Sequence, residues 1–150
     1  MSQLSTFHVG KYLFGVDVSL VQEVVRLQLM TPVPLASPEI AGLINLRGEV
    51  LTAIDLRARL GLPPADSTRE PVNVVVRVDD EPVSLLVDEI GGVLEVSQVP
   101  FEQTPSTVDE RVRDLLLGAY TLPERLLLAL NAKRVLDVGA ALDAAEPVKA

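Results

Sequence analysis

Two segments of this chain, residues 42–55 and 118–131, can be laid over each other without a gap. Glycine, leucine and alanine occur at matching positions of the two segments. Each segment ends on a short polar residue that can cap a helix. A shorter likeness joins residues 15–17 to residues 86–88. The chain is therefore predicted to contain two copies of one small unit of about five strands. Copies of that size bury little core alone, so they are expected to pack together and leave a groove between them.

The first copy shows the elements that each unit is predicted to contain. Apolar runs at residues 43–46 and 50–54 flank Arg47-Gly48, which indicates a hairpin turn between two strands. Asp55 then ends the second strand, and its carboxylate is expected to cap a short helix. A turn needs no arginine, so Arg47 is either a solvated surface cation or a residue that binds a partner.

Elsewhere, runs of aliphatic residues between turn residues indicate further strands. These are residues 4–9, 12–16, 72–78, 83–87, 93–96 and 126–130. From Asp17 the spacing changes, and this predicts a helix capped by Asp17 or Ser19. The apolar residues of its stripe are Leu20, Val21, Val24 and Val25. A helical pattern also precedes Leu115, where the repeat instead predicts the start of a strand.

The composition agrees with a β-rich core. Aromatic residues make up only 3% of the chain and Trp is absent, so the core must be built from Val, Leu, Ile and Ala. With 11 Pro and 9 Gly, this mixture favours short strands joined by tight turns over a helical bundle. We expect a single domain over residues 1–150, with a link between its halves at residues 61–71 and a frayed tail at residues 140–150.

Charge and hydropathy limit the classes of partner. The formal charge of −8 argues against nucleic acid, which needs a basic surface to displace its counterions. The N-terminus lacks a basic segment followed by an apolar core, and no run approaches about 18 apolar residues. The sequence therefore predicts neither export nor insertion into a membrane, and a cytoplasmic protein is the expectation.

Catalytic and metal-binding patterns are absent from the sequence. The chain has one His and no Cys, so it lacks the residues that catalytic triads and most metal sites require. Glycine-rich phosphate loops and nucleophile elbows are missing as well. We therefore expect no enzyme, no metal and no cofactor, and interpret the chain as a protein-binding module. A sensor that binds a small molecule in the groove between the copies is the alternative from another class.

Three blocks of residues then carry a resemblance to a known family. They are Phe14-Gly-Val-Asp-Val-x-x-Val-Gln-Glu-Val, then Ile40-x-Gly-Leu-Ile-Asn-Leu-Arg-Gly-Glu-Val-Leu-x-x-Ile-Asp-Leu-Arg, then Leu86-Val-Asp-Glu-Ile-x-x-Val-Leu. Together they resemble the CheW family of chemotaxis coupling proteins, in order and over nearly the whole chain.

The resemblance implies a mainly β fold of two pseudo-symmetric, SH3-like, five-stranded β-barrels packed together, with short helices. It also implies a non-catalytic adaptor that couples the cytoplasmic tip of methyl-accepting chemoreceptors to a CheA-type histidine kinase, in arrays at the membrane. A related pathway, for pilus motility or development, uses similar couplers, and an excised kinase regulatory domain has the same fold. The receptor, the kinase, the signal and the oligomeric state are left open by the sequence.

The resemblance further implies two sets of binding residues. The receptor hairpin is expected in the groove between the barrels, at Val21, Glu23, Gly42, Arg47 and Val93. Contacts with the kinase are expected at the end of a barrel, at Leu43, Asn45, Gly48 and Val50. In this reading Arg47 is a polar anchor for the partner.

Overall fold

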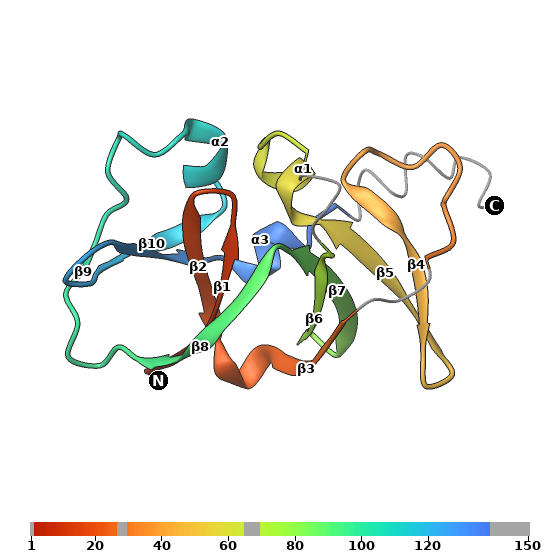
Figure 1. The fold of residues 1–150 in the computed structure, drawn as a ribbon, viewed down its shortest axis with the longest axis horizontal. Coiled ribbons are helices and arrows are strands. Elements are labelled where there is room, and N and C mark those ends of the chain that lie inside the picture. Colours follow the sequence, from red (N-terminus) through yellow and green to blue (C-terminus); the bar gives the residue numbers. More distant parts are fainter. Residues whose placement is uncertain (1, 27–29, 65–69, 139–150) are drawn as a thin grey trace.

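The computed structural model describes residues 2–26, 30–64 and 70–138, which form two β-sheets and a few short helices (Figure 1). The strands are β1 (Gln3–Val9), β2 (Tyr12–Asp17), β3 (Val21–Val25), β4 (Ile40–Leu46), β5 (Glu49–Asp55), β6 (Val72–Val78), β7 (Glu81–Val87), β8 (Glu89–Glu95), β9 (Phe101–Glu102), β10 (Leu116–Thr121) and β11 (Leu126–Leu130). The helices are the 3-10 turn η1 (Val18–Leu20), α1 (Leu56–Leu60), α2 (Glu110–Arg113) and α3 (Ala132–Val135). The predicted mainly β architecture with short helices is confirmed.

The two sheets repeat one another and exchange strands. Their strand orders are β8-β1-β2-β11-β10-β9 and β3-β6-β7-β5-β4. In each, two hairpins lie side by side, with β11 parallel to β2 in one and β5 parallel to β7 in the other. The chain crosses between the sheets twice, because β3 leaves β2 to pair with β6, and β8 leaves β7 to pair with β1. Apart from the two-residue β9, each sheet has five strands, as the repeat predicts.

The register of the hairpins confirms the longer repeat. Gly42 pairs with Ala53 in one hairpin, and Gly118 pairs with Ala129 in the other, each directly after a bulge. Both glycines are needed for close packing. A Cβ at Gly42 would lie 2.8 Å from the carbonyl oxygen of Thr31, and one at Gly118 would lie 2.5 Å from a ring carbon of Phe101. The gapless alignment therefore matches equivalent positions in space.

The shorter repeat is shifted by two residues from the sequence alignment. Ala129 pairs with Gly15, and its equivalent Ala53 pairs with Ser84. The structural partner of Gly15 is therefore Ser84 and not Leu86, as the sequence alignment has it. A shift of two residues keeps every side chain on the same face of a strand, which is why the apolar patterns still agree.

The segment predicted as a helix after Asp17 is instead η1 followed by strand β3. Asp17 is the cap, since its carboxylate accepts a hydrogen bond of 2.9 Å from the amide of Ser19. β3 pairs antiparallel with β6, and a bulge between Val21 and Glu23 shifts the register. That bulge breaks the strict alternation of a strand, so the apolar residues imitate a helical stripe. Pairing with a strand far along the chain outweighs the local pattern.

The other short helices agree with their predictions. Asp55 caps α1 by accepting from the amide of Ala58 at 3.3 Å, and Asn131 caps α3 by accepting from the amide of Arg134 at 3.1 Å. Before Leu115 the helical pattern corresponds to the single turn α2, and β10 begins directly after it. The expected tail at residues 140–150 and part of the expected link at residues 61–71 lie outside the described residues.

Apolar side chains form three clusters, two inside the sheets and one between them. The six-stranded sheet encloses Leu13 and Leu127, and the five-stranded sheet encloses Leu51 and Val75. Each sheet curls around its own cluster as a barrel. We call the six-stranded unit the first barrel and the five-stranded unit the second barrel.

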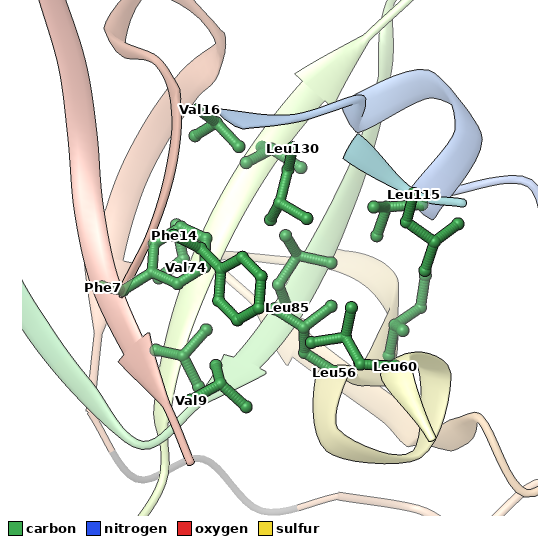
Figure 2. Close-up of a cluster of buried hydrophobic side chains, with 14 of the residues drawn as sticks. Phe7, Val9, Phe14, Val16, Leu56, Leu60, Val74, Leu85, Leu115 and Leu130 are labelled. Carbon is green, nitrogen blue, oxygen red and sulfur yellow. The ribbon is translucent and has the colours of Figure 1, made fainter. Parts of the chain in front are cut away.

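The largest cluster, which we call the shared core, lies between the two barrels (Figure 2). Figure 2 shows Phe7 and Phe14 of the first barrel pointing toward Leu85 of the second, with Leu56 and Leu60 of α1 beside them. Because neither barrel covers this surface alone, burial of the shared core holds the two barrels together.

Polar contacts join the barrels where α1 meets the β1–β2 turn. Arg57 of α1 binds Asp88 through two hydrogen bonds, from Nε to Oδ1 at 3.0 Å and from Nη2 to Oδ2 at 2.6 Å. The same Oδ2 accepts from the amide of Gly10 in the turn at 2.8 Å. Arg59 reaches across to α3 and donates to the carbonyls of Arg134 and Val135.

Candidate protein-interaction site

The turn between β4 and β5 holds one arginine away from the body of the second barrel. Arg47 and Gly48 both have positive φ, at 55° and 85°, which is the backbone of a tight two-residue hairpin turn. The side chain of Asn45 supports the turn by accepting from the amide of Gly48 at 3.1 Å. Glycine is suited to its position, but a positive φ is uncommon for arginine.

Arg47 is paired with Glu23 across the two edges of the second barrel. Its Nη2 lies 3.0 Å from Oε1 of Glu23, and its Nη1 lies 3.3 Å from Oε2. Because β3 and β4 are the edge strands of this sheet, the pair joins the two edges. The side chain of Arg47 is 74% exposed, whereas that of Glu23 is only 18% exposed. An exposed ion pair contributes about 1 kcal/mol or less, so Arg47 remains available to a partner.

The other three predicted receptor-binding residues lie in different surroundings. Val21 is half-buried against the shared core. Gly42 is buried on β4, under the backbone of Thr31. Val93 is 53% exposed on β8, opposite Ser5, and so belongs to the first barrel. The structure therefore brings Glu23 and Arg47 into contact, while Val93 lies on the other barrel.

Three of the four predicted kinase-binding residues share one face of the β4–β5 hairpin. Leu43 lies opposite Thr52 and Asn45 lies opposite Val50, so all four side chains point to the same side. Val50 is 61% exposed. Gly48, the fourth predicted residue, is at the tip of the hairpin. Together they form an exposed surface with an apolar side chain near its end.

Sequence reasoning missed one exposed residue on β3. Val24 is 42% exposed, although the helical pattern placed it on a buried stripe. It pairs with Val74, and Val93 pairs with Ser5 at the equivalent position of the other copy. Val24 and Val93 are thus equivalent exposed valines on the two crossing strands. An alignment of the shorter repeat that equates Gly15 with Ser84 also equates Val24 with Val93, and would have pointed to Val24.

The described part of the chain contains neither a group of metal ligands nor a membrane-spanning helix. Among its residues, no group of three or more His, Asp and Glu side chains is arranged to hold a metal ion. Within the same ranges, no helix is long and apolar enough to cross a membrane.

Comparison with known proteins identifies the family. A family model described as "CheW-like domain" matches residues 3–139. The chain belongs to the CheW family. Among its relatives, the chemotaxis protein CheW of Rhizobium meliloti is 34% identical over 133 residues, which are 89% of this chain and 86% of the relative. The chemotaxis protein CheW of Bacillus subtilis is 33% identical over 135 residues, which are 90% of this chain and 86% of the relative.

A solved structure shares the fold of this CheW family member. The crystal structure of the scaffolding protein TtCheW from Thermoanaerobacter tengcongensis matches with a TM-score of 0.81 and 23% identity. The match covers 94% of this chain and 96% of that one. The expected fold of two SH3-like β-barrels is therefore confirmed. Family membership makes the chain an adaptor of chemotaxis signalling.

Proposed function

We propose that this adaptor is non-catalytic and joins the cytoplasmic tip of a methyl-accepting chemoreceptor to a CheA-type histidine kinase. The observation that carries the proposal is the match of a CheW-like domain to residues 3–139, nearly the whole chain. The protein would then act in the cytoplasm, at receptor arrays, as a single unit of two barrels.

The receptor would bind beside the Glu23–Arg47 pair. A receptor tip is a hairpin of amphipathic helices, which offers apolar side chains and acceptors for hydrogen bonds. Val93, exposed on the first barrel, supplies apolar area, and Arg47 supplies donors for a charge-assisted bond. Val21 and Gly42 would act mainly by shaping β3 and β4, because one is half-buried and the other is covered by Thr31.

The kinase would bind the exposed face of the β4–β5 hairpin. Val50 is its most exposed apolar side chain, with Leu43 and Asn45 beside it on the same face. Gly48 would allow a close approach at the tip, since nothing lies within 4 Å of a Cβ built at that position. An apolar centre with a polar rim is typical of an interface between proteins.

Sedimentation of receptor arrays tests this proposal. A receptor cytoplasmic fragment and a CheA-type kinase are sedimented with and without the protein, and kinase autophosphorylation is measured in the pellet. We expect the wild-type protein to bring the kinase down with the receptor and to raise its activity. Arg47→Ala should reduce binding to the receptor, and Val50→Asp should reduce binding to the kinase.

A matched control separates binding from folding. Arg125 lies near the tip of the equivalent hairpin in the first barrel, and within the described residues its side chain donates a single hydrogen bond, of 3.4 Å, to the carbonyl of Lys11. Arg125→Ala should therefore behave like wild type in sedimentation. The proposal for Arg47 fails if Arg47→Ala melts at a clearly lower temperature, since the residue would then be structural. Failure of the wild-type protein to bind either partner, across several receptor classes, would exclude the coupling role.

A further inference from the structure

The shared core has two ends, and the repeat makes them equivalent. At the α1 end, the β1–β2 turn of the first barrel meets α1. There the carboxylate of Asp88 accepts hydrogen bonds from the amide of Gly10 in the turn and from Arg57 of α1. At the α3 end, the β6–β7 turn of the second barrel meets α3, and Asp79 of the turn lies 3.3 Å from Nζ of Lys133. Each end therefore consists of a hairpin turn from one barrel and a helix that directly follows a hairpin of the other barrel.

Aromatic side chains fill the α1 end. Phe14 is fully buried, and its ring centroid lies 5.7 Å from that of Tyr12 and 6.4 Å from that of Phe7. Figure 2 shows Phe14 between the two barrels and close to α1. After α1, Leu62 lies 3.5 Å from the position of a Cβ built on Gly10. The chain thus occupies this end with its own side chains.

The α3 end has smaller side chains at the equivalent positions. Tyr12 pairs with Val9 at the end of its hairpin, and Glu81 pairs with Val78 in the same way, so Glu81 corresponds to Tyr12. By the same register Val83 corresponds to Phe14. A pocket of about 560 Å³ opens here, with Val78, Val83 and Leu136 among its lining residues. That volume is within the usual range for pockets that take a ligand.

The charged groups at the pocket's edge are unevenly paired. Lys133 is paired with Asp79, but their side chains are 76% and 71% exposed, so the pair is easily broken by a partner. Arg134 donates to the carbonyl of Asp114. Glu81 and Asp137 also line the pocket, and within the described residues neither carboxylate has an ion-pair partner. The edge therefore favours a cation.

We propose that this pocket binds a peptide segment of a partner protein that presents an aromatic side chain next to lysine or arginine. The ring would lie on Val83 and Leu136, in the space that Phe14 and Tyr12 fill at the α1 end. The cation would lie beside Glu81 and Asp137. Lys133, released from Asp79, would donate to a backbone carbonyl of the peptide, as its equivalent Arg57 donates to the carbonyl of Pro63 at 2.7 Å.

The chain's own exposed segments fit this description poorly. Phe101 is an exposed aromatic residue, but it is followed by Glu102 and preceded by Pro100, so a second copy would bring an acid toward acids. Residues 139–150 contain no aromatic residue. The occupant is therefore another protein. The pocket adjoins the β4–β5 face, because β7 pairs with β5 and Val83 lies opposite Thr52, but its lining residues come from β6, β7 and α3 and their flanking turns.

Titration of the whole chain, residues 1–150, with a short peptide tests the proposal. The probe is the acetylated, amidated peptide Gly-Lys-Phe-Pro-Lys-Gly, followed by amide proton–nitrogen correlation spectra. Saturable shifts should be confined to the β6–β7 turn and α3. Replacing Phe by Ala in the peptide should weaken binding by about tenfold or more, and replacing both Lys by Glu should have a similar effect.

Two variants and a control complete the test. Val83→Phe copies the residue of the α1 end and should fill the pocket, so it should abolish the shifts. Glu81→Lys combined with Asp137→Lys changes only the edge, and it should abolish binding even if Val83→Phe does not fold. Asp109→Lys, a change at an exposed acid away from the pocket, should leave binding unchanged.

Several results would overturn the proposal. Absence of localised shifts at saturating peptide would exclude the site, and so would equal binding of the Phe and Ala peptides. Continued binding to a folded Val83→Phe protein would place the peptide elsewhere. Shifts at α3 that depend on the concentration of the protein alone would assign the pocket to a second copy of the chain.

Discussion

The α1 end and the α3 end of the shared core have the same backbone plan and different side chains. At the α1 end, Arg57 and Asp88 are largely buried, with side-chain exposures of 18% and 10%, and two hydrogen bonds join them. At the α3 end, the pair formed by Lys133 and Asp79 is exposed and has a single contact of 3.3 Å. The first pair is held in place by the fold, whereas the second is open to competition from solvent and partners.

This difference shows how a duplicated unit can separate stability from binding. The repeat requires both hairpins and both capped helices, because each barrel needs them to cover the shared core. It does not require both ends to be filled. Aromatic rings at one end hold the barrels together, which leaves the equivalent positions at the other end free to carry small and charged residues.

The largest expected effect comes from emptying the filled end. Phe14→Ala should lower the free energy of unfolding by about 3–5 kcal/mol, because it removes a fully buried ring from the shared core between the two barrels. Val83→Ala, at the equivalent position, should cost only about 1–2 kcal/mol, since it removes two methyl groups beside an existing pocket. Urea unfolding followed by circular dichroism measures both. Equal losses would mean that the two ends contribute equally, and the comparison would be wrong.

The ion pairs give a second, smaller contrast. Asp88→Asn leaves Arg57 without its charge partner and should cost about 2–3 kcal/mol, which is less than for a fully buried pair. Donation of hydrogen bonds to the Asp88 carboxylate raises the pKa of Arg57 in the wild-type protein, and in the variant the guanidinium stays charged because it does not lose its proton in proteins. Asp79→Asn should change stability by at most about 0.5 kcal/mol, because Asn tolerates the positive φ of 52° and the lost pair is exposed.

Salt provides the check on that contrast. Added sodium chloride should reduce the small effect of Asp79→Asn to nothing and leave most of the effect of Asp88→Asn, because solvent ions screen exposed pairs far more than buried ones. A loss from Asp88→Asn that vanishes in high salt would show that the Arg57 pair is no better protected than its equivalent.

Most of the fold was predictable from the sequence because its signals are local. Hairpin turns such as Gly10-Lys11 and Arg47-Gly48, and the helix caps Asp55 and Asn131, depend on residues close together in the chain. The longer repeat added the relation between distant hairpins. The family motif supplied the candidate residues, and the structure shows that Glu23 and Arg47 among them are in contact.

Features that depend on distant parts of the chain were not predictable. β3 was predicted as a helix because its pairing with β6, with a bulge at Val21, leaves no trace in local spacing. The contacts of Asp88 with both Arg57 and Gly10 depend on how the barrels dock. The pocket at the α3 end exists because the side chain of Val83 is smaller than that of Phe14 at the equivalent position. The two positions can be equated only once the strand register is known.

A further comparison concerns two aspartates that the sequence alignment equates, Asp17 and Asp88. Asp88 connects the barrels, whereas the carboxylate of Asp17, within the described ranges, accepts hydrogen bonds from Ser19 alone, from its amide at 2.9 Å and its hydroxyl at 2.8 Å. Asp17→Ala should therefore cost about 0.5–1 kcal/mol at neutral pH, the usual loss for a cap.

The dependence of this loss on pH distinguishes a local cap from a contact between barrels. Hydrogen bonds from the amide and hydroxyl of Ser19 lower the pKa of Asp17. Because the folded-state pKa is below the unfolded value of about 3.9, the ionised carboxylate stabilises the fold above that pH, and the contribution is lost as pH falls through the folded pKa. Unfolding free energies of wild type and Asp17→Ala should therefore converge in acid. A constant difference between the two proteins at every pH would mean that Asp17 acts through packing and not through its charge.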